Sequence, residues 1–239
     1  GDLGTSISTG EPVLTAMLDR LGVTAQVVLV SFTAAMLIAV PAGLLAAHRQ
    51  DSTLDLSVVI GVVLCLSVPS FWVGLMLILL FGVELGWLPT VGWVSPLDDF
   101  SEGLRYLVLP ALALLLVEMG QVARMTRAST IEVLRLDYIL HARAKGLPES
   151  RVLWRHAFPN AVAPTVTVAG MLLGSLLGGA AVIETVFTLP GLGRLLVDAI
   201  YQRDYPVVQG TLLLVATVQV LMNLLVDLVY PLLDPRVKL

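Results

Sequence analysis

Long stretches that are almost free of charged side chains dominate the sequence. Five such stretches cover about residues 21–47, 56–83, 106–123, 157–183 and 205–227. Only Glu118 and the terminal Asp227 interrupt them. A helix needs about 17 to 25 apolar residues to cross a bilayer core. Because lipid offers no partner to backbone amides and the stretches show no period-two alternation, the pattern predicts five membrane helices.

The composition agrees with an all-α, polytopic membrane protein. Of the 239 residues, 57% are hydrophobic and 13% are charged. A soluble chain of this length would place charges along the solvent face of each helix. Five apolar stretches in one chain also disfavour the alternative of buried core helices in a large soluble protein. The sequence therefore predicts a single transmembrane domain over 1–239, with residues 1–20 as an outer segment.

Basic residues gather on one side of the predicted spans. The stretch between the third and fourth spans carries Arg124, Arg127, Arg135, Arg143, Lys145, Arg151 and Arg155. Because Lys and Arg are enriched in cytoplasmic loops, residues 124–156 are predicted to form a cytoplasmic loop, and the C-terminus is predicted to be cytoplasmic. Five spans then place Gly1 outside. No targeting segment precedes Gly1, so we expect a further span upstream of it.

The sequence predicts no catalytic residue and no metal site in this chain. The three histidines form no ligand motif such as H-E-x-x-H, and Cys65 is the only cysteine. Neither of the two lysines completes a phosphate-binding G-x-x-x-x-G-K-[ST] loop. Any ATP chemistry must therefore come from a partner.

The predicted cytoplasmic loop has a helical pattern of its own. Ile131, Leu134 and Tyr138 recur at helical spacing, and we expect one helix that ends at Gly146. Gly146 suits a left-handed C-cap, and a second short helix is expected to start at Pro148. A short capped helix outside the membrane could insert into a groove of a cytoplasmic partner. The spacing equally allows a solvated basic loop.

Several motifs resemble the dipeptide, oligopeptide and nickel permease family of ATP-binding-cassette (ABC) importers. The segment DYILHARAKGL at 137–147 resembles the coupling-helix motif of that family. Further similar segments are GDLGTS at 1–6, SVPSFW at 67–72, ETVF at 184–187, PGLG at 190–193, DYPVVQG at 204–210 and LDPR at 233–236. The resemblance covers essentially the whole chain.

Two features depart from the family pattern. Leu140 and His141 stand where the general importer motif has Glu-Ala, whereas Ala142 and Gly146 are retained. The peptide branch commonly lacks that Glu, so this departure favours the branch. The family also has six spans with its N-terminus inside, and the expected upstream span would reconcile this with the five predicted here.

The resemblance implies the permease fold of a type I ABC importer, in a bacterial or archaeal cytoplasmic membrane. It also implies a heterodimer with a second, related permease, two cytoplasmic ATPase subunits or domains, and an extracytoplasmic solute-binding protein. ATP and magnesium would bind to the ATPases, and this chain would hold no cofactor and bind no nucleic acid. The substrate would be a peptide, nickel, glutathione or a similar small solute.

The resemblance also assigns roles to particular residues. ATPase coupling is expected at Tyr138, Ala142, Arg143, Ala144, Lys145, Gly146, Leu147 and Pro159. An outer gate or a contact with the binding protein is expected at Glu184, Phe187, Pro190, Gly191 and Gly193. We expect Ala142 to be small because a larger side chain would prevent close docking in the partner's groove. For Glu118, a role in the pathway or at an interface and a structural role are equally open, because an ionisable group inside a span is costly unless paired or hydrated.

Two rival functions stay open. A secondary transporter driven by an ion gradient would predict inverted repeats and acids near the membrane midplane. The sequence shows no repeat, and Glu118 is the only candidate acid in a span interior. A membrane scaffold without a transport role is the other alternative.

Overall fold

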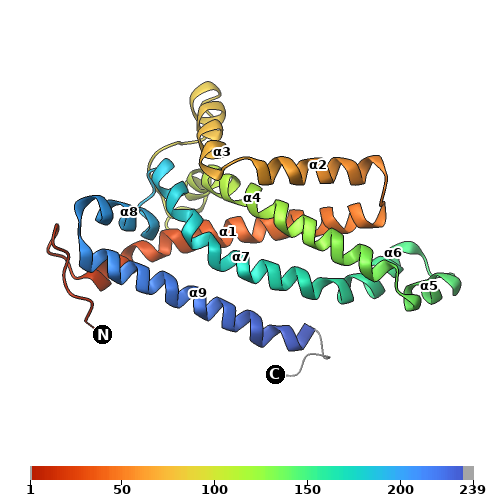
Figure 1. Ribbon diagram of the computed structural model, residues 1–239. Helices are drawn as coiled ribbons and strands as arrows, with labels where there is room; N and C mark the ends of the chain where they lie inside the picture. The colour runs from red at the N-terminus through yellow and green to blue at the C-terminus, as the bar shows by residue number, and fades with distance from the viewer. Residues whose placement is uncertain (1, 234–239) are drawn as a thin grey trace. The chain divides into compact units, whose positions relative to one another are not determined.

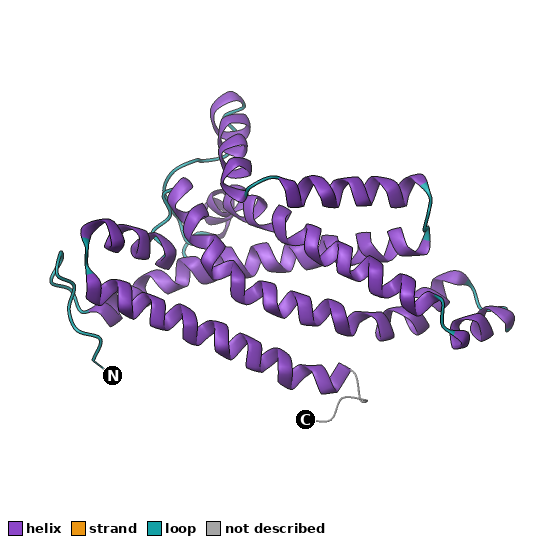
Figure 2. Cartoon of the chain, viewed as in Figure 1, coloured by secondary structure: helices purple, strands orange, loops and turns teal. Residues whose placement is uncertain are grey.

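The computed structural model describes residues 2–233, and helices form almost all of its regular structure (Figures 1 and 2). The elements are α1 (Val13–His48), α2 (Thr53–Ser67), α3 (Ser70–Leu77), the π-helix η1 (Ile78–Glu84), α4 (Phe100–Leu134), α5 (Asp137–Ala144), α6 (Glu149–Arg151), the π-helix η2 (Val152–Ala157), α7 (Phe158–Val186), α8 (Leu192–Gln202) and α9 (Tyr205–Leu233). The predicted all-α fold class is confirmed. Residues 13–20, expected in the outer segment, already belong to α1.

Four segments among the described residues are long and apolar enough to cross a membrane as single helices. They are Val13–His48, Phe100–Leu134, Glu149–Val186 and Tyr205–Val226. The second predicted span is different, because α2 and the α3–η1 segment meet at an angle of 98°. Pro69 lies at this break in an extended conformation, and a proline disfavours helical backbone in the residue before it. The described residues therefore contain five candidate spans if this bent pair counts as one.

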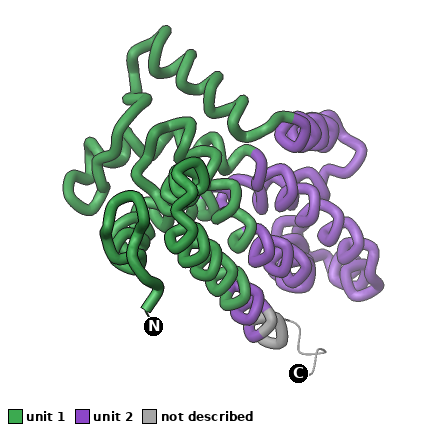
Figure 3. The backbone as a smooth tube through the Cα atoms, turned by 60° about the vertical axis from the view of Figure 1, so that its left-hand side comes forward, with its two compact units in different colours: residues 1–33, 68–116, 173–221 green, residues 34–67, 117–172, 222–239 purple. Residues whose placement is uncertain are grey.

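The chain folds into two compact units (Figure 3). Unit 1 comprises residues 1–33, 68–116 and 173–221, and unit 2 comprises residues 34–67, 117–172 and those from 222 onward. Each of α1, α4, α7 and α9 contributes one segment to each unit.

Unit 1 is held together by two apolar clusters. In the larger one, Val27 of α1, Leu109 of α4 and Leu176 of α7 pack around Phe187, which follows α7. In the smaller one, α8 packs through Leu192 against the start of α1 and against α9. Between apolar helices in lipid, such close packing rather than exclusion of water favours association.

Unit 2 has its main cluster around Leu44, near the end of α1. Val133 of α4, Ile139 of α5 and Leu153 of η2 pack there. Gly43 allows the close approach of α1 and α4, because a Cβ at this position would lie 2.7 Å from the carbonyl oxygen of Ala123. The short helix α5 is therefore part of a packed core.

A buried ion pair links α2 to α4 in unit 2. Asp55, 4% exposed, accepts hydrogen bonds from Nε and Nη2 of Arg127 at 2.5 and 2.7 Å. It also accepts one from the backbone N–H of Asp51 at 3.0 Å, in the turn between α1 and α2. A bidentate arginine–carboxylate pair fixes both orientation and position. The pair therefore sets the register of α2 on α4.

We predict that Asp55→Ala will destabilise the protein by about 2 to 3 kcal/mol, because it leaves Arg127 partly buried without its anion. The control Asp198→Ala removes an exposed pair with Arg194 at 3.7 Å and should cost less than about 0.5 kcal/mol. Thermal unfolding of the purified protein in one detergent measures both. Equal stability of the two variants would contradict the assignment.

Candidate functional site

The segment between α4 and α7 contains a break that the sequence pattern did not predict. One helix ending at Gly146 was expected, but α4 ends at Leu134 and α5 begins at Asp137. Val133 and Ile139 both point into the unit 2 core. In one continuous helix these two positions would lie about 120° apart around the axis. The extended backbone at Leu136 rotates α5 so that both can be buried.

The predicted end of this helix is confirmed at Gly146. Its φ is +76°, in the left-handed region that favours glycine. The N–H of Gly146 donates to the carbonyl of Arg143 at 2.9 Å, and that of Leu147 donates to the carbonyl of Ala142 at 3.4 Å. These two bonds form a Schellman motif, which satisfies the last carbonyls of α5. Pro148 then precedes α6, so the second short helix is also confirmed.

The surroundings of Ala142 correct the reason proposed for its small size. Its side chain is 7% exposed and packs in the unit 2 core with Leu44 and Ile139. The small size of Ala142 is therefore explained by the close packing of α5 against its own chain. The exposed face of α5 carries Tyr138 and Leu140 instead.

The other predicted coupling residues lie around the end of α5. Arg143 donates from Nε and Nη2 to Glu149 of α6 at 2.8 and 3.2 Å. His48 Nδ1 at the end of α1 lies 3.9 Å from the same carboxylate. Ala144, Lys145 and Gly146 are exposed, Leu147 is half-buried against the unit 2 core, and Pro159 lies exposed in the first turn of α7. Exposed pairs contribute little energy, so the apolar core positions α5.

Glu184 organises the predicted outer loop in unit 1. Its fully buried carboxylate accepts a hydrogen bond from the hydroxyl of Thr24 at 2.6 Å and from the N–H of Arg194 at 2.9 Å. The N–H of Leu192 donates to the same Thr24 oxygen at 2.8 Å. A carboxylate at a helix N-terminus satisfies free N–H groups and suits the helix dipole. Glu184 and Thr24 thus hold the start of α8.

The two predicted glycines of this loop fit tightly around Glu184. A Cβ at Gly191 would lie 2.2 Å from the carboxyl carbon of Glu184, and one at Gly193 would lie 2.3 Å from Cα of Ala181. Phe187 is buried as well, whereas Pro190 is exposed. Four of the five expected outer residues therefore lie inside unit 1. Of the five, only Pro190 is placed to touch another protein.

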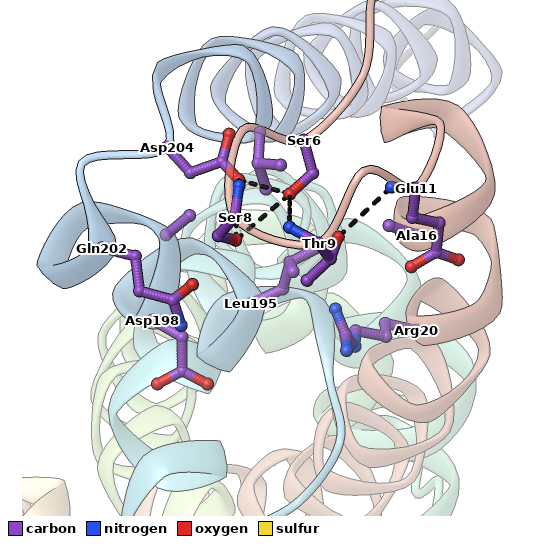
Figure 4. Close-up of a pocket in the computed structure, with 12 residues that line it drawn as sticks. Ser6, Ser8, Thr9, Glu11, Ala16, Arg20, Leu195, Asp198, Gln202 and Asp204 are labelled. Carbon is purple, nitrogen blue, oxygen red and sulfur yellow. Dashed lines mark hydrogen bonds between the residues drawn. The ribbon is translucent and has the colours of Figure 1, made fainter.

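Asp204, the first residue of the DYPVVQG motif, forms a second cluster of buried hydrogen bonds, a role that the motif did not predict (Figure 4). Its side chain is 2% exposed. It accepts hydrogen bonds from the hydroxyl of Ser6 at 2.5 Å and from the hydroxyl and N–H of Ser8 at 3.0 and 3.2 Å. The N-terminal segment is thereby attached to the turn between α8 and α9. In the sequence, this role could have been inferred only from the position of Asp204, an acidic residue directly before an apolar stretch.

A cavity of about 110 Å³ lies beside the hydrogen bonds of Asp204. Glu11, Asp198 and Asp204 contribute to its lining, together with Arg20 (Figure 4). Within residues 2–233, no group of three or more His, Cys, Asp or Glu side chains is arranged to hold a metal ion. Burial raises the pKa of Asp204, but the hydrogen bonds from Ser6, Ile7 and Ser8 outweigh it and lower the pKa from 3.8 to about 2.

Glu118 lies in the unit 2 part of α4 and is 9% exposed. Its Oε2 atom accepts no hydrogen bond from the described part of the chain. A buried carboxyl oxygen without a hydrogen-bond donor is costly, so Glu118 is a position at which the structure leaves a polar atom unsatisfied. Its role in a pathway stays a prediction.

Comparison with known proteins identifies the family. Residues 39–239 match the family described as "Binding-protein-dependent transport system inner membrane component". The chain belongs to this family. Relatives in this family are named as transport system permease proteins, which agrees with the resemblance of the motifs.

Individual relatives cover nearly the whole chain. A protein of Brucella abortus (strain 2308) is 46% identical over 237 residues, which are 99% of this chain and 76% of that protein. The oligopeptide transport system permease protein AppB of Bacillus subtilis (strain 168) is 41% identical over 241 residues, covering 100% and 76%. The dipeptide transport system permease protein DppB of Escherichia coli (strain K12) is 41% identical over 261 residues, covering 100% and 77%.

Solved structures agree in fold. A chain of the MetNI methionine ABC transporter in an inward-facing conformation matches with a TM-score of 0.73 at 19% identity, covering 91% of this chain and 95% of that one. A chain of an amino acid ABC transporter matches with a TM-score of 0.59 at 16% identity, covering 94% and 95%. The chain therefore has the permease fold of ABC importers.

We predict that Gly191→Ala will destabilise unit 1 by about 1 to 3 kcal/mol, because the added methyl group collides with the Glu184 carboxylate. Its φ of −97° is accessible to any residue, so backbone strain does not contribute. Gly178→Ala in α7 is the control, since no atom lies within 4 Å of a Cβ there. Thermal unfolding and protease sensitivity of the loop before α8 measure the effect. If Gly191→Ala had the unfolding temperature and protease sensitivity of the native protein, the predicted clash would be disproved.

Asp204 should make stability depend on pH in acid. Its folded pKa of about 2 lies below its ordinary value of 3.8, so its contribution is complete above pH 4 and is lost as the pH falls from about 4 to 2. Asp204→Asn should therefore unfold at a lower temperature than the native protein at pH 6, and this difference should shrink by pH 3. A difference that is the same at both values would contradict the prediction.

Proposed function

We propose that this chain is a transmembrane permease subunit of an ATP-driven importer of peptides. The observation that carries the proposal is 41% identity over the full length of this chain to AppB and DppB, whose names describe oligopeptide and dipeptide transport. The family match supports dependence on a binding protein. Within the family, nickel and glutathione are the alternative substrates.

The subunit would work in a larger assembly. A second, related permease would complete the translocation path, and two ATPase subunits or domains would bind ATP and magnesium in the cytoplasm. A solute-binding protein would deliver the peptide on the outer side. The basic segment between α4 and α7 supports a cytoplasmic position for α5, and with it a cytoplasmic C-terminus.

The helix α5 is the element best suited to receive the ATPase. It is short, it ends in a fixed Schellman motif, and it exposes Tyr138 and Leu140. Trp154 of η2 is also exposed next to this segment in the chain. Because Ile139 anchors α5 in the unit 2 core, a displacement of α5 must move α1 and η2 with it.

Alternating access would follow from such a displacement. The helices α1, α4 and α7 are continuous, and each begins in one unit and ends in the other. A movement imposed on unit 2 at α5 would be carried along them. Glu184 and Asp204 would keep the outer elements of unit 1 in place during the cycle.

We predict that Leu140→Asp will uncouple ATP hydrolysis from uptake, because it places a charge on the exposed apolar face of α5. Leu140 is 53% exposed, so folding should be unaffected. The purified complex in proteoliposomes should lose at least about 90% of binding-protein-dependent peptide uptake while the ATPase subunits still hydrolyse ATP. Leu97→Asp, in an exposed loop of unit 1, should behave like the native complex.

The same preparation separates the rival functions. Uptake that needs ATP and the binding protein, and that resists a protonophore, supports the proposal. Uptake driven by an ion gradient without ATP would establish a secondary transporter. An assembled complex without transport of peptides, nickel or glutathione would favour a scaffold.

A further inference from the structure

A groove of about 290 Å³ lies between α2 and α4 in unit 2. Its wall on the α2 side is apolar and includes Val59, Val63 and Leu66. Its α4 side includes Ala123, Arg124 and Arg127. None of the functions assigned above uses this groove.

The groove is bounded at each end by a contact between α2 and α4. At one end, Asp55 and Arg127 form the bidentate pair that links α2 to α4. At the other end the two helices touch, since a Cβ at Gly120 would lie 3.0 Å from Cγ of Leu66. About three turns of α2, roughly 15 Å, separate these contacts. The groove is therefore a built feature of the helix pair.

The charges at the groove favour an anion. Arg127 is neutralised by Asp55, but Arg124 is exposed and forms no ion pair with the described residues. Arg124 is also the first charged residue after the apolar stretch 106–123, which places it at the level of lipid headgroups. An occupant must therefore combine a negative group with an apolar chain.

We infer that this groove binds an anionic phospholipid, with an acyl chain along α2 and the phosphate at Arg124. This rests on the proposed function only in requiring that the chain spans a membrane. A basic pocket between membrane helices on the cytoplasmic side is typical of sites for anionic headgroups. Free phosphate would leave the apolar wall uncovered.

Native mass spectrometry of the purified complex with added phosphatidylglycerol or phosphatidylcholine tests this site. The native complex should retain phosphatidylglycerol preferentially, and Arg124→Gln should weaken that binding about fivefold. Arg135→Gln, which removes an equal charge from the turn between α4 and α5, should change nothing. Val63→Trp should fill the groove and abolish the additional bound lipid. Leu64→Trp, on the same helix but outside the groove, should not.

Four results would overturn the inference. Equal retention of both lipids, or native affinity in Arg124→Gln, would show that no anionic lipid site exists. Displacement of phosphatidylglycerol by inorganic phosphate would identify a free anion as the ligand. A cross-link to the second permease from Val63→Cys in a Cys65→Ser background, with no lipid retained, would identify a subunit interface. Because ATP-dependent uptake is measured separately, each result is distinguishable from a failure of the proposed function.

Discussion

Three buried carboxylates that accept hydrogen bonds from distant segments hold the elements of this protein in place. In lipid, apolar helices gain little specificity from hydrophobic contact, because lipid tails are as apolar as the helix surfaces. A charged group inside the protein is costly unless its oxygens are paired, so it tolerates few alternative arrangements. Asp55, Glu184 and Asp204 each accept hydrogen bonds from a segment distant in the sequence. These three groups give otherwise similar helices a defined register.

The two units use these carboxylates for different purposes. In unit 1, Glu184 and Asp204 fix the two ends of α8, which joins the last two long helices. In unit 2, Asp55 fixes the turn between α1 and α2 while the apolar core around Leu44 fixes α5. The predicted coupling element thus depends on packing, and the outer loop depends on hydrogen bonds.

The sequence was sufficient for those features that depend on local chemistry. Apolar length predicted the spans, and the Gly146 cap followed from the conformational freedom of glycine. The break before Asp137 and the burial of Ala142 escaped prediction, because both depend on which residues share the core around Ile139. The carboxylate contacts join residues 72, 160 and 198 positions apart, which no local pattern encodes. Roles for the predicted coupling residues and outer residues came only from the resemblance of their motifs to those of a known family.

The π-helical turn Val152–Ala157 has a consequence for how the coupling element could vary. A π turn is equivalent to an insertion of one residue into an α-helix. It therefore sets the rotational phase between α7 and the segment that carries α5 and α6. Deleting one residue in this turn would leave the helix intact but rotate everything before it by about 100° relative to α7. The number of residues in this turn thus fixes the direction in which α5 faces. An insertion or deletion there would turn the exposed surface of α5 without changing any residue of that surface.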